Sequence, residues 1–165
     1  MFKLDAIKDM NQEERLKYML ILVKGQLSSE KDDLANISNV TGIIMACIER
    51  LNWAGFYILR DDELVLGPFQ GLPACNRIAI GKGVCGRAVE TKELQLVSDV
   101  HLFPGHIACD SASNSELVVP LIKDNKVYGV LDLDSPVKNR FTKIEEEYFI
   151  KLVEILNQNI DWDNI

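Results

Sequence analysis

The chain has 165 residues, of which 47% are hydrophobic and 26% are charged, and its net charge is −7. This length and composition predict one globular domain with a full core and argue against wholesale disorder. Because lysine and arginine are scattered along the chain and are outnumbered by acids, the charge pattern disfavours binding to nucleic acid.

The N-terminal segment MFKLDAIKDM lacks the basic and apolar regions of a secretion signal. No apolar run approaches the ~18 residues that a membrane span needs. We therefore expect a cytoplasmic protein without a membrane partner. In that compartment its four cysteines are read as reduced thiols, metal ligands or redox catalysts and not as a structural disulfide framework.

Two helices are predicted in the first third of the chain. The first covers residues 11–24, with Asn11 as its N-cap and Gly25 as its end, and its apolar positions are Leu16, Met19, Leu20 and Val23. The second covers about 30–50, with Ser29 as its cap. Helical spacing predicts that its buried side is formed by Leu34, Ile37, Val40, Ile44, Cys47 and Ile48.

The middle of the chain changes to the pattern of β-strands. Strands are predicted within residues 52–59, 63–71, 77–80, 94–97, 115–123 and 126–134, with a short glycine-led helix within 81–93. Hairpin turns are expected at Arg60–Asp62 and at Asp124–Asn125. The loop 98–114 exceeds an ordinary connection, and its apolar residues indicate a packed, functional loop.

A last helix is predicted over residues 143–159, where Thr142 and Glu145 form a capping box. Its inner stripe consists of Phe149, Leu152, Val153 and Leu156. The order of elements indicates an α+β fold whose helices cover one face of a mostly antiparallel sheet. We divide the chain into N-terminal helices (1–50), a sheet with its pocket loops (51–135) and a closing helix (142–160).

Three of the four cysteines fall at turn or loop positions, namely Cys75, Cys85 and Cys109, whereas Cys47 is read as a small buried hydrophobe. Together with His106, the three could form a Cys₃His zinc site. The spacing disfavours this reading because the sequence contains no Cys-x₂-Cys pair. We therefore expect neither a metal nor a cofactor.

Redox chemistry explains the three cysteines better. Cys85 lies at the start of a predicted helix, where the dipole favours a thiolate. Cys109 is followed by small polar residues that can donate hydrogen bonds to its sulfur. A second thiol within reach allows an oxidised sulfur to resolve as a disulfide. His106 can lower the pKa of a nearby thiol or hold the loop backbone; we favour the structural role for His106 and for His101.

The acids of the second half gather on one face of the predicted sheet. Asp132 and Asp134 are two residues apart in a strand and point to the same face, and Glu116 begins the probable partner strand. A solvent-exposed face of the sheet would explain these acids. However, two neighbouring valines, Val118 and Val130, favour a partly buried pocket. Carboxylates crowded there would have at least one raised pKa and could donate a proton or bind an ammonium group.

Trp53, Gly55 and Tyr57 share a face of their strand by alternation. Core packing is the simpler account of these rings. With the glycine between them, they could also form a wall for a small apolar group.

At these positions the sequence resembles the free methionine-(R)-sulfoxide reductases, which are single GAF domains. The resemblance rests on NWAGFY, LVLGPFQG, PAC, GKGVCG, DVHLFPGHIACDSASNSELVVPL and GVLDLDSP, and it runs from about residue 52 to the closing helix. It implies a six-stranded antiparallel sheet with a ligand pocket on the face opposite the helices. It also implies an L-methionine (R)-S-oxide reductase that acts on free methionine sulfoxide and not on methionine within proteins.

The resemblance also assigns roles. It makes Cys109 the nucleophile, Cys75 the principal resolving thiol and Cys85 a third, less essential thiol. It makes Trp53 and Tyr57 the aromatic wall of the substrate pocket, whose acids are Glu116, Asp132 and Asp134.

The chemistry of the reaction makes these roles intelligible. A thiolate attacks the sulfoxide sulfur only if the oxygen can leave as part of a sulfenic acid, so an acid must protonate that oxygen. Asp134 or Glu116 would serve, with Asp132 for the substrate ammonium, and these roles could be exchanged. Backbone amides of residues 83–86 are candidates for binding the substrate carboxylate. Thioredoxin would be the reductant, and the loop 98–114 would be a lid that shifts between redox states. A homodimer through the helical face is compatible with the sequence.

Two other classes of protein compete with this reading. A GAF domain that senses a ligand without catalysis would not need Cys75 and Cys109 together. A small zinc protein would bind stoichiometric metal and unfold with chelators.

Overall fold

The computed structural model describes residues 7–105, 107 and 111–165 of the chain. Its long helices are α1 (Gln12–Ser29), α2 (Asp33–Cys47) and α4 (Lys143–Asn159), and α3 (Gly83–Thr91) is shorter. The strands are β1 (Trp53–Arg60), β2 (Glu63–Gln70), β3 (Arg77–Ala79), β4 (Gln95–Val97), β5 (Ser115–Lys123) and β6 (Lys126–Ser135). Two 3₁₀ turns lie at Val100–Leu102 and Trp162–Asn164.

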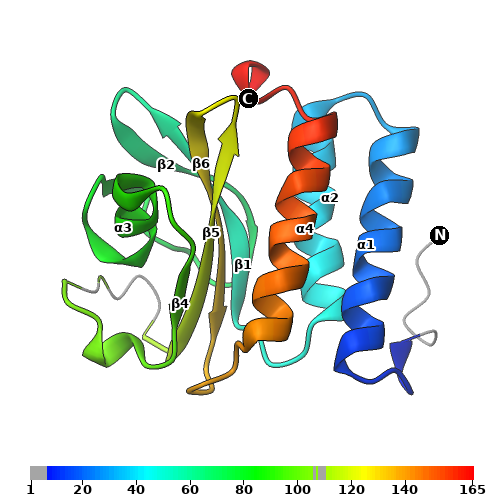
Figure 1. Ribbon diagram of the computed structural model, residues 1–165, viewed down its shortest axis with the longest axis horizontal. Helices are drawn as coiled ribbons and strands as arrows, with labels where there is room; N and C mark the ends of the chain where they lie inside the picture. The colour runs from blue at the N-terminus through cyan, green and yellow to red at the C-terminus, as the bar shows by residue number, and fades with distance from the viewer. Residues whose placement is uncertain (1–6, 106, 108–110) are drawn as a thin grey trace.

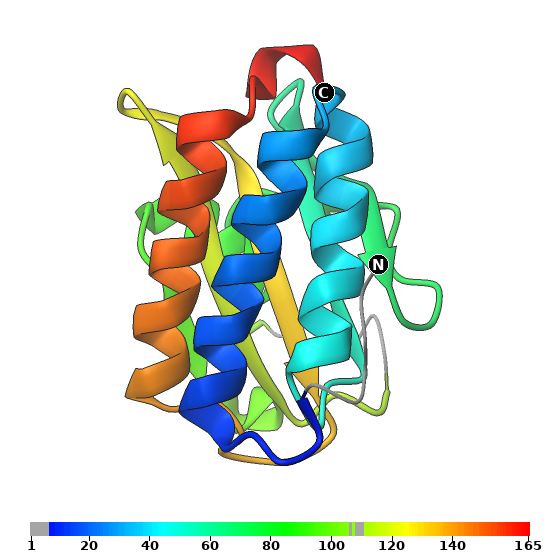
Figure 2. The same ribbon diagram turned by 90° about the vertical axis from the view of Figure 1, so that its right-hand side faces the viewer.

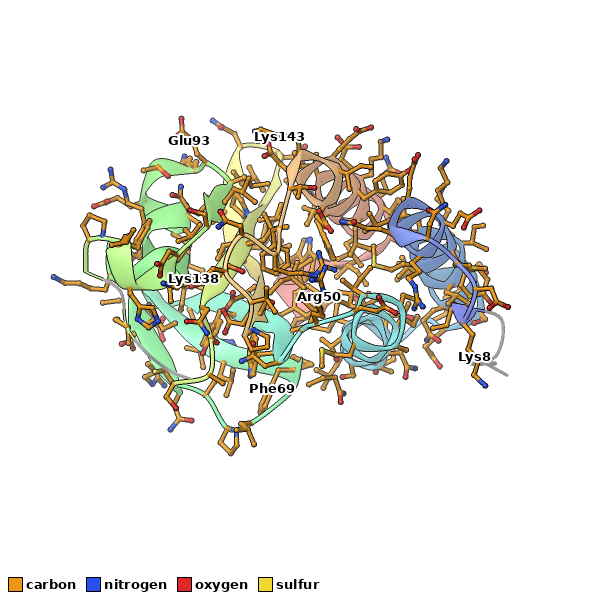
Figure 3. All side chains as sticks on the ribbon, turned by 90° about the horizontal axis from the view of Figure 1, so that it is seen from below. Lys8, Arg50, Phe69, Glu93, Lys138 and Lys143 are labelled. Carbon is orange, nitrogen blue, oxygen red and sulfur yellow. The ribbon has the colours of Figure 1, made fainter. Side chains whose placement is uncertain are left out.

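The six strands form one antiparallel sheet in the order β3-β2-β1-β6-β5-β4. The three long helices lie on one face of the sheet and α3 lies on the other (Figure 1). The view from below shows the same separation (Figure 3). This arrangement confirms the predicted α+β fold with helices on one face.

The helical side is itself built in two layers. Helices α2 and α4 pack against the strands, whereas α1 packs against α2 and α4 (Figure 2). The apolar residues that β1, β5 and β6 turn toward this side form one core with the helices. Because alternate residues of a strand face opposite ways, the other residues of these strands form a second, smaller cluster below α3.

Helices α1 and α4 begin where capping residues predict, whereas the position of a glycine does not predict where α1 ends. Asn11 and Glu14 form a capping box at the start of α1, and Thr142 and Glu145 form another at the start of α4. The expected end of α1 at Gly25 is wrong, because the helix continues to Ser29. Glycine inside a helix costs only about 1 kcal/mol, and continuing the helix carries the next apolar position into the core, where Leu27 is buried.

The start of α2 also differs from the prediction. Ser29 is the last residue of α1, and the cap of α2 is Asp32, whose side chain accepts a hydrogen bond of 2.7 Å from the backbone N–H of Ala35. Leu34 was expected in the core but is 56% exposed, because it lies in the first turn of α2. The remaining predicted core positions of this helix are buried, including Cys47.

Both predicted hairpins turn through two residues in the left-handed region. Asp61 and Asp62 have φ of 49° and 63°, and Asp124 and Asn125 have φ of 50° and 65°. Two residues with positive φ match the twist of antiparallel strands, and aspartate and asparagine tolerate that conformation. Within the described residues, no helix is both long enough and apolar enough to cross a bilayer.

A buried ion pair fixes the start of α4 against the helical core. Arg140 Nη1 donates a hydrogen bond of 2.5 Å to Glu145 Oε1, and both side chains are buried. Arg140 Nε donates to the backbone oxygen of Glu49 at 2.9 Å. Burial by itself would raise the pKa of Glu145, but hydrogen bonds from Thr142 and Arg140 outweigh it and hold that pKa below its ordinary value.

We expect Glu145→Gln to lower the free energy of unfolding by about 3–5 kcal/mol, because it leaves the Arg140 guanidinium buried without a counter-charge. Since the pKa of Glu145 is depressed in the folded state, the stability it contributes is present above its ordinary pKa and is lost as the pH falls through the folded value. Urea denaturation at neutral and acid pH measures both effects.

The matched control is Glu147→Gln, which removes an exposed ion pair with Lys151 in the same helix. Its cost should stay below about 1 kcal/mol. Equal losses in the two variants would contradict the assignment of the buried pair.

Candidate active site

A pocket lies on the face of the sheet opposite the long helices. It encloses about 30 Å³ and is lined by Trp53, Tyr57, Ala74, Ile78, Gly83, Val84, Cys85, Ile107, Ser113, Glu116, Asp132 and Asp134. Six of the eight residues that the sequence singled out as site residues are therefore brought together here. The other two are Cys75, which is described below, and Cys109.

The register of the three central strands aligns the acids. Asp134 on β6 lies between Trp53 on β1 and Glu116 on β5, so these three form one row across the sheet. Asp132 forms the next row, between Gly55 and Val118. The predicted common face of the three acids is confirmed, and the structure adds that this face is closed by α3, which packs against β5 and β6.

The two inner acids are almost entirely withdrawn from water, with exposures of 7% for Glu116 and 6% for Asp132. Burial is the main cause that raises the pKa of Glu116 well above its ordinary value, and the charges of Asp132 and Asp134 raise it further. Burial also raises the pKa of Asp132, to about 6, although hydrogen bonds with Cys85 and Glu116 oppose the rise. Glu116 is thus the better proton donor at neutral pH.

Asp132 also presents an oxygen that needs a partner. Its Oδ1 is buried and has no hydrogen-bond partner among the residues that the structure describes. A buried acceptor without a donor costs about 1–3 kcal/mol relative to a satisfied one. The pocket therefore holds a position where a donor or a cation from a ligand would be stabilised.

Cys85 lies in the first turn of α3 and its side chain is buried in the same pocket. Its Sγ donates a weak hydrogen bond to Glu116 Oε1 across 3.9 Å. The expectation of a thiolate at this position is wrong. Burial and the charges of Asp132 and Glu116 raise the pKa of Cys85 well above its ordinary value, because they outweigh the favourable helix dipole.

Aromatic rings close the pocket on the β1 side. The ring of Trp53 stacks on Tyr57 at 5.9 Å between centroids and on Phe69 at 5.3 Å. Gly55 makes room for this arrangement, since a Cβ at that position would lie 2.5 Å from Trp53 Cη2. The predicted wall of Trp53 and Tyr57 with a glycine between them is therefore present as stacked rings.

The segment that carries Cys75 lies against the same rings. Tyr57 Oη donates a hydrogen bond of 3.0 Å to the backbone oxygen of Cys75, and Trp53 Nε1 donates one of 3.2 Å to that of Leu72. Cys75 is half-buried and disulfide-bonded, whereas Cys47 and Cys85 are free thiols. The two ring residues thus serve as pocket wall and as anchors for the cysteine segment.

Cys109 and His106 lie outside the described residues, so their predicted roles stay predictions. The described parts of their loop are tied to the sheet. Asn52 Nδ2 donates a hydrogen bond of 3.0 Å to Ser113 Oγ. The ring of His101 is 3.0 Å from Asn114 Oδ1, which agrees with the structural role favoured for that histidine.

The backbone amides at the start of α3 are only partly available to a ligand. The N–H of Gly83 donates to the backbone oxygen of Gly105 at 3.2 Å, and that of Gly86 donates to Lys82 at 3.0 Å. Of the four backbone amides expected as candidates for binding a carboxylate, those of Gly83 and Gly86 thus already donate hydrogen bonds. The candidates that remain are the amides of Val84 and Cys85, two residues that line the pocket.

The sequence reading did not single out Phe69 or Ser113. Counting outward from the hairpin turn pairs Tyr57 with Leu66 and would place Pro68 beside Gly55, but a bulge shifts the register so that Phe69 lies there. Proline at this point is a signal for such a bulge, because it cannot donate a ladder hydrogen bond.

The comparisons with known proteins agree with this geometry. The family model described as GAF domain matches residues 35–161. The free methionine-R-sulfoxide reductase of Escherichia coli is 50% identical over 80% of this chain and 80% of its own length. That of Saccharomyces cerevisiae is 42% identical over 92% of this chain and 88% of its own length.

A crystal structure of the Neisseria meningitidis free methionine-R-sulfoxide reductase in complex with its substrate superposes with a TM-score of 0.91. It is 36% identical in sequence, and the match covers 96% of this chain and 95% of the other.

We expect Asp132→Asn to stabilise the fold at neutral pH by up to about 3 kcal/mol, since the raised pKa of about 6 corresponds to about 1.4 kcal/mol per unit. The folded pKa lies above the unfolded one, so the stability linked to the proton is complete below the ordinary aspartate pKa and is lost as the pH rises toward 6. Because asparagine does not ionise, the variant does not lose this stability as the pH rises.

Thermal denaturation between pH 4 and pH 8 measures the difference between wild type and variant, which should grow with pH. The control Asp124→Asn changes an exposed aspartate in the turn between β5 and β6. A difference for Asp132→Asn that does not vary with pH would contradict the raised pKa.

Proposed function

The chain belongs to the GAF domain family, within the group of the free methionine-R-sulfoxide reductases, and on this premise we propose that it reduces free L-methionine (R)-sulfoxide to L-methionine. The observation that carries the proposal is the buried pair Glu116 and Asp132 beneath an aromatic wall. The sulfoxide oxygen requires a neutral acid that can donate a proton to it. The substrate ammonium requires a carboxylate oxygen that has no other hydrogen-bond partner.

The pocket offers a complementary group for each part of the amino acid. The ammonium group donates to Asp132 Oδ1, the buried oxygen without a described partner. The methyl group lies against the ring of Trp53. The carboxylate accepts hydrogen bonds from the amides of Val84 and Cys85, where the N-terminus of α3 favours negative charge.

The reduction uses one thiol and one proton donor. The thiolate of Cys109 attacks the sulfoxide sulfur while Glu116 protonates the oxygen, with Asp134 as the alternative donor. The protonated oxygen then passes from the substrate sulfur to the sulfur of Cys109. The bond between the two sulfurs and the substrate sulfur–oxygen bond break, a bond between oxygen and Cys109 Sγ forms, and methionine departs, which leaves Cys109 as a sulfenic acid. The raised pKa of Glu116 supports its choice as donor, because an ordinary glutamate would be ionised at neutral pH.

A second thiol completes the cycle. Cys75 attacks the sulfenic sulfur of Cys109, a disulfide forms and water leaves with the oxygen and two protons. The disulfide-bonded state of Cys75 supports its role as the resolving thiol. Thioredoxin returns both sulfurs to thiols by exchange, and Cys85 is the further thiol of the pocket.

The size of the pocket requires an opening step. Its free volume of about 30 Å³ accommodates one or two water-sized groups, which is much less than methionine sulfoxide occupies. Ile107 and Ser113 of the loop 98–114 line the pocket. We therefore infer that the loop 98–114 acts as a lid that withdraws to admit substrate.

Purified protein, thioredoxin with its reducing system and each epimer of free L-methionine sulfoxide should yield methionine from the R epimer alone. Cys109→Ser should abolish turnover, because no sulfenic acid can form. Cys47→Ala is the matched control, since that thiol lies in the helical core away from the pocket, and its activity per folded molecule should equal that of wild type. Methionine from neither epimer, with substrate still bound, would favour a sensor domain instead.

Glu116→Gln should lower kcat by about 10²–10⁴-fold, because the amide cannot supply the proton. KM should change much less, since the amide retains the shape of the pocket. Steady-state kinetics with thioredoxin measure both constants, and Asp124→Asn serves as the exposed control. An unchanged kcat would assign the proton donor to Asp134.

A further inference from the structure

Three potential metal ligands meet in the pocket from three different elements. Sγ of Cys85 on α3, a carboxylate oxygen of Glu116 on β5 and one of Asp132 on β6 all lie within 4.8 Å of one another, and all three residues are buried. The positions are fixed by the fold, because α3 packs against both strands. This donor set differs from the Cys₃His set considered from the sequence, and it shares only Cys85 with it.

The spacing of the donors suits a tetrahedral cation. A zinc ion with sulfur at about 2.3 Å and oxygen at about 2.1 Å separates these two donors by about 3.6 Å. In the structure, Cys85 Sγ and Glu116 Oε1 are 3.9 Å apart. For this pair, binding the ion requires the two donor atoms to approach by about 0.3 Å.

A second observation points to a cation independently of the spacing. Asp132 is more than nine-tenths buried and lines the pocket, and its Oδ1 has no hydrogen-bond partner among the described residues. The lining of the pocket includes three acids, and no lysine or arginine is found among its described lining residues. The field inside the pocket therefore attracts positive charge.

We propose that the pocket binds one thiophilic divalent cation, Zn²⁺ or Cd²⁺, through Sγ of Cys85 and one carboxylate oxygen from each of Glu116 and Asp132. Water occupies the fourth position, as in three-ligand zinc sites. Cys85 releases its proton to solvent when the metal–sulfur bond forms, so that the thiolate is the ligand.

Metal and substrate should then exclude each other. This consequence rests on the proposed function, in which Asp132 receives the substrate ammonium and Glu116 protonates the sulfoxide. When both carboxylates bind the metal, Asp132 cannot bind the substrate ammonium and Glu116 cannot protonate the sulfoxide. The cation therefore acts as a reversible inhibitor of the reduced enzyme. The metal site itself rests on the geometry alone.

The test uses a full-length variant in which Cys85 is the only cysteine, made with Cys47→Ala, Cys75→Ser and Cys109→Ser. Titration with Cd²⁺ in thiol-free buffer is followed by the ultraviolet charge-transfer absorption of a cadmium–thiolate bond. We expect saturation at one Cd²⁺ per chain. Adding Cys85→Ser should remove the band, and Asp132→Asn should weaken the affinity by at least about tenfold, whereas Asp124→Asn should leave it unchanged.

Absence of the band, or an Asp132→Asn variant with unchanged affinity, would overturn the metal site. If circular dichroism shows that the single-cysteine variant is unfolded, a second comparison is used instead. The number of Cd²⁺ ions bound per chain is then measured for reduced wild type and for Cys85→Ser. One fewer Cd²⁺ in Cys85→Ser supports the site, and equal stoichiometry overturns it.

A competition arm separates this inference from the proposed reaction. Free L-methionine (R)-sulfoxide added to the Cd²⁺-loaded single-cysteine variant should reduce the band. A band that does not respond would overturn mutual exclusion. The readout needs no turnover, so a failure of the reductase assay and a failure of the metal site give different results.

Discussion

The pocket depends on two carboxyl groups, Glu116 and Asp132, that the fold holds out of water on one face of the sheet. Taking an ionised carboxylate out of water is costly, and the protein lowers this cost by raising the affinity of both groups for protons. The same burial leaves Asp132 Oδ1 without a described partner. The acidity, the attraction for a cation and the link between pH and stability all follow from this one constraint.

The rest of the architecture serves to hold these groups in place. The alternation of the central strands gives the helices a continuous apolar face and leaves the opposite face for function. The buried pair of Arg140 and Glu145 and two capping boxes stabilise the helical layer. On the pocket side, α3 covers the acids, and the aromatic rings of β1 anchor the segment that carries Cys75.

Cys85 shows how the surroundings of a residue override its local signal. The start of a helix favours a thiolate, yet burial and the neighbouring charges of Asp132 and Glu116 raise the pKa of the Cys85 thiol well above its ordinary value. A thiol held in this way is a poor nucleophile at neutral pH, which agrees with a subordinate role in the proposed reaction. It is also a soft ligand beside two hard ones, so a thiophilic cation could bind where a substrate ammonium would otherwise lie.

The sequence by itself determined the α+β class, the extent of the closing helix and the common face of Glu116, Asp132 and Asp134. Those features depend on local rules: capping residues, helical spacing and the two-residue period of a strand. It misjudged the end of α1 at Gly25 and the exposure of Leu34, because packing outweighs small local preferences. Only the tertiary structure decided that Phe69 stacks on Trp53, that Tyr57 holds the Cys75 segment and that Cys85 lies against Glu116. These contacts join distant segments, and their energies depend on burial, which local sequence does not specify.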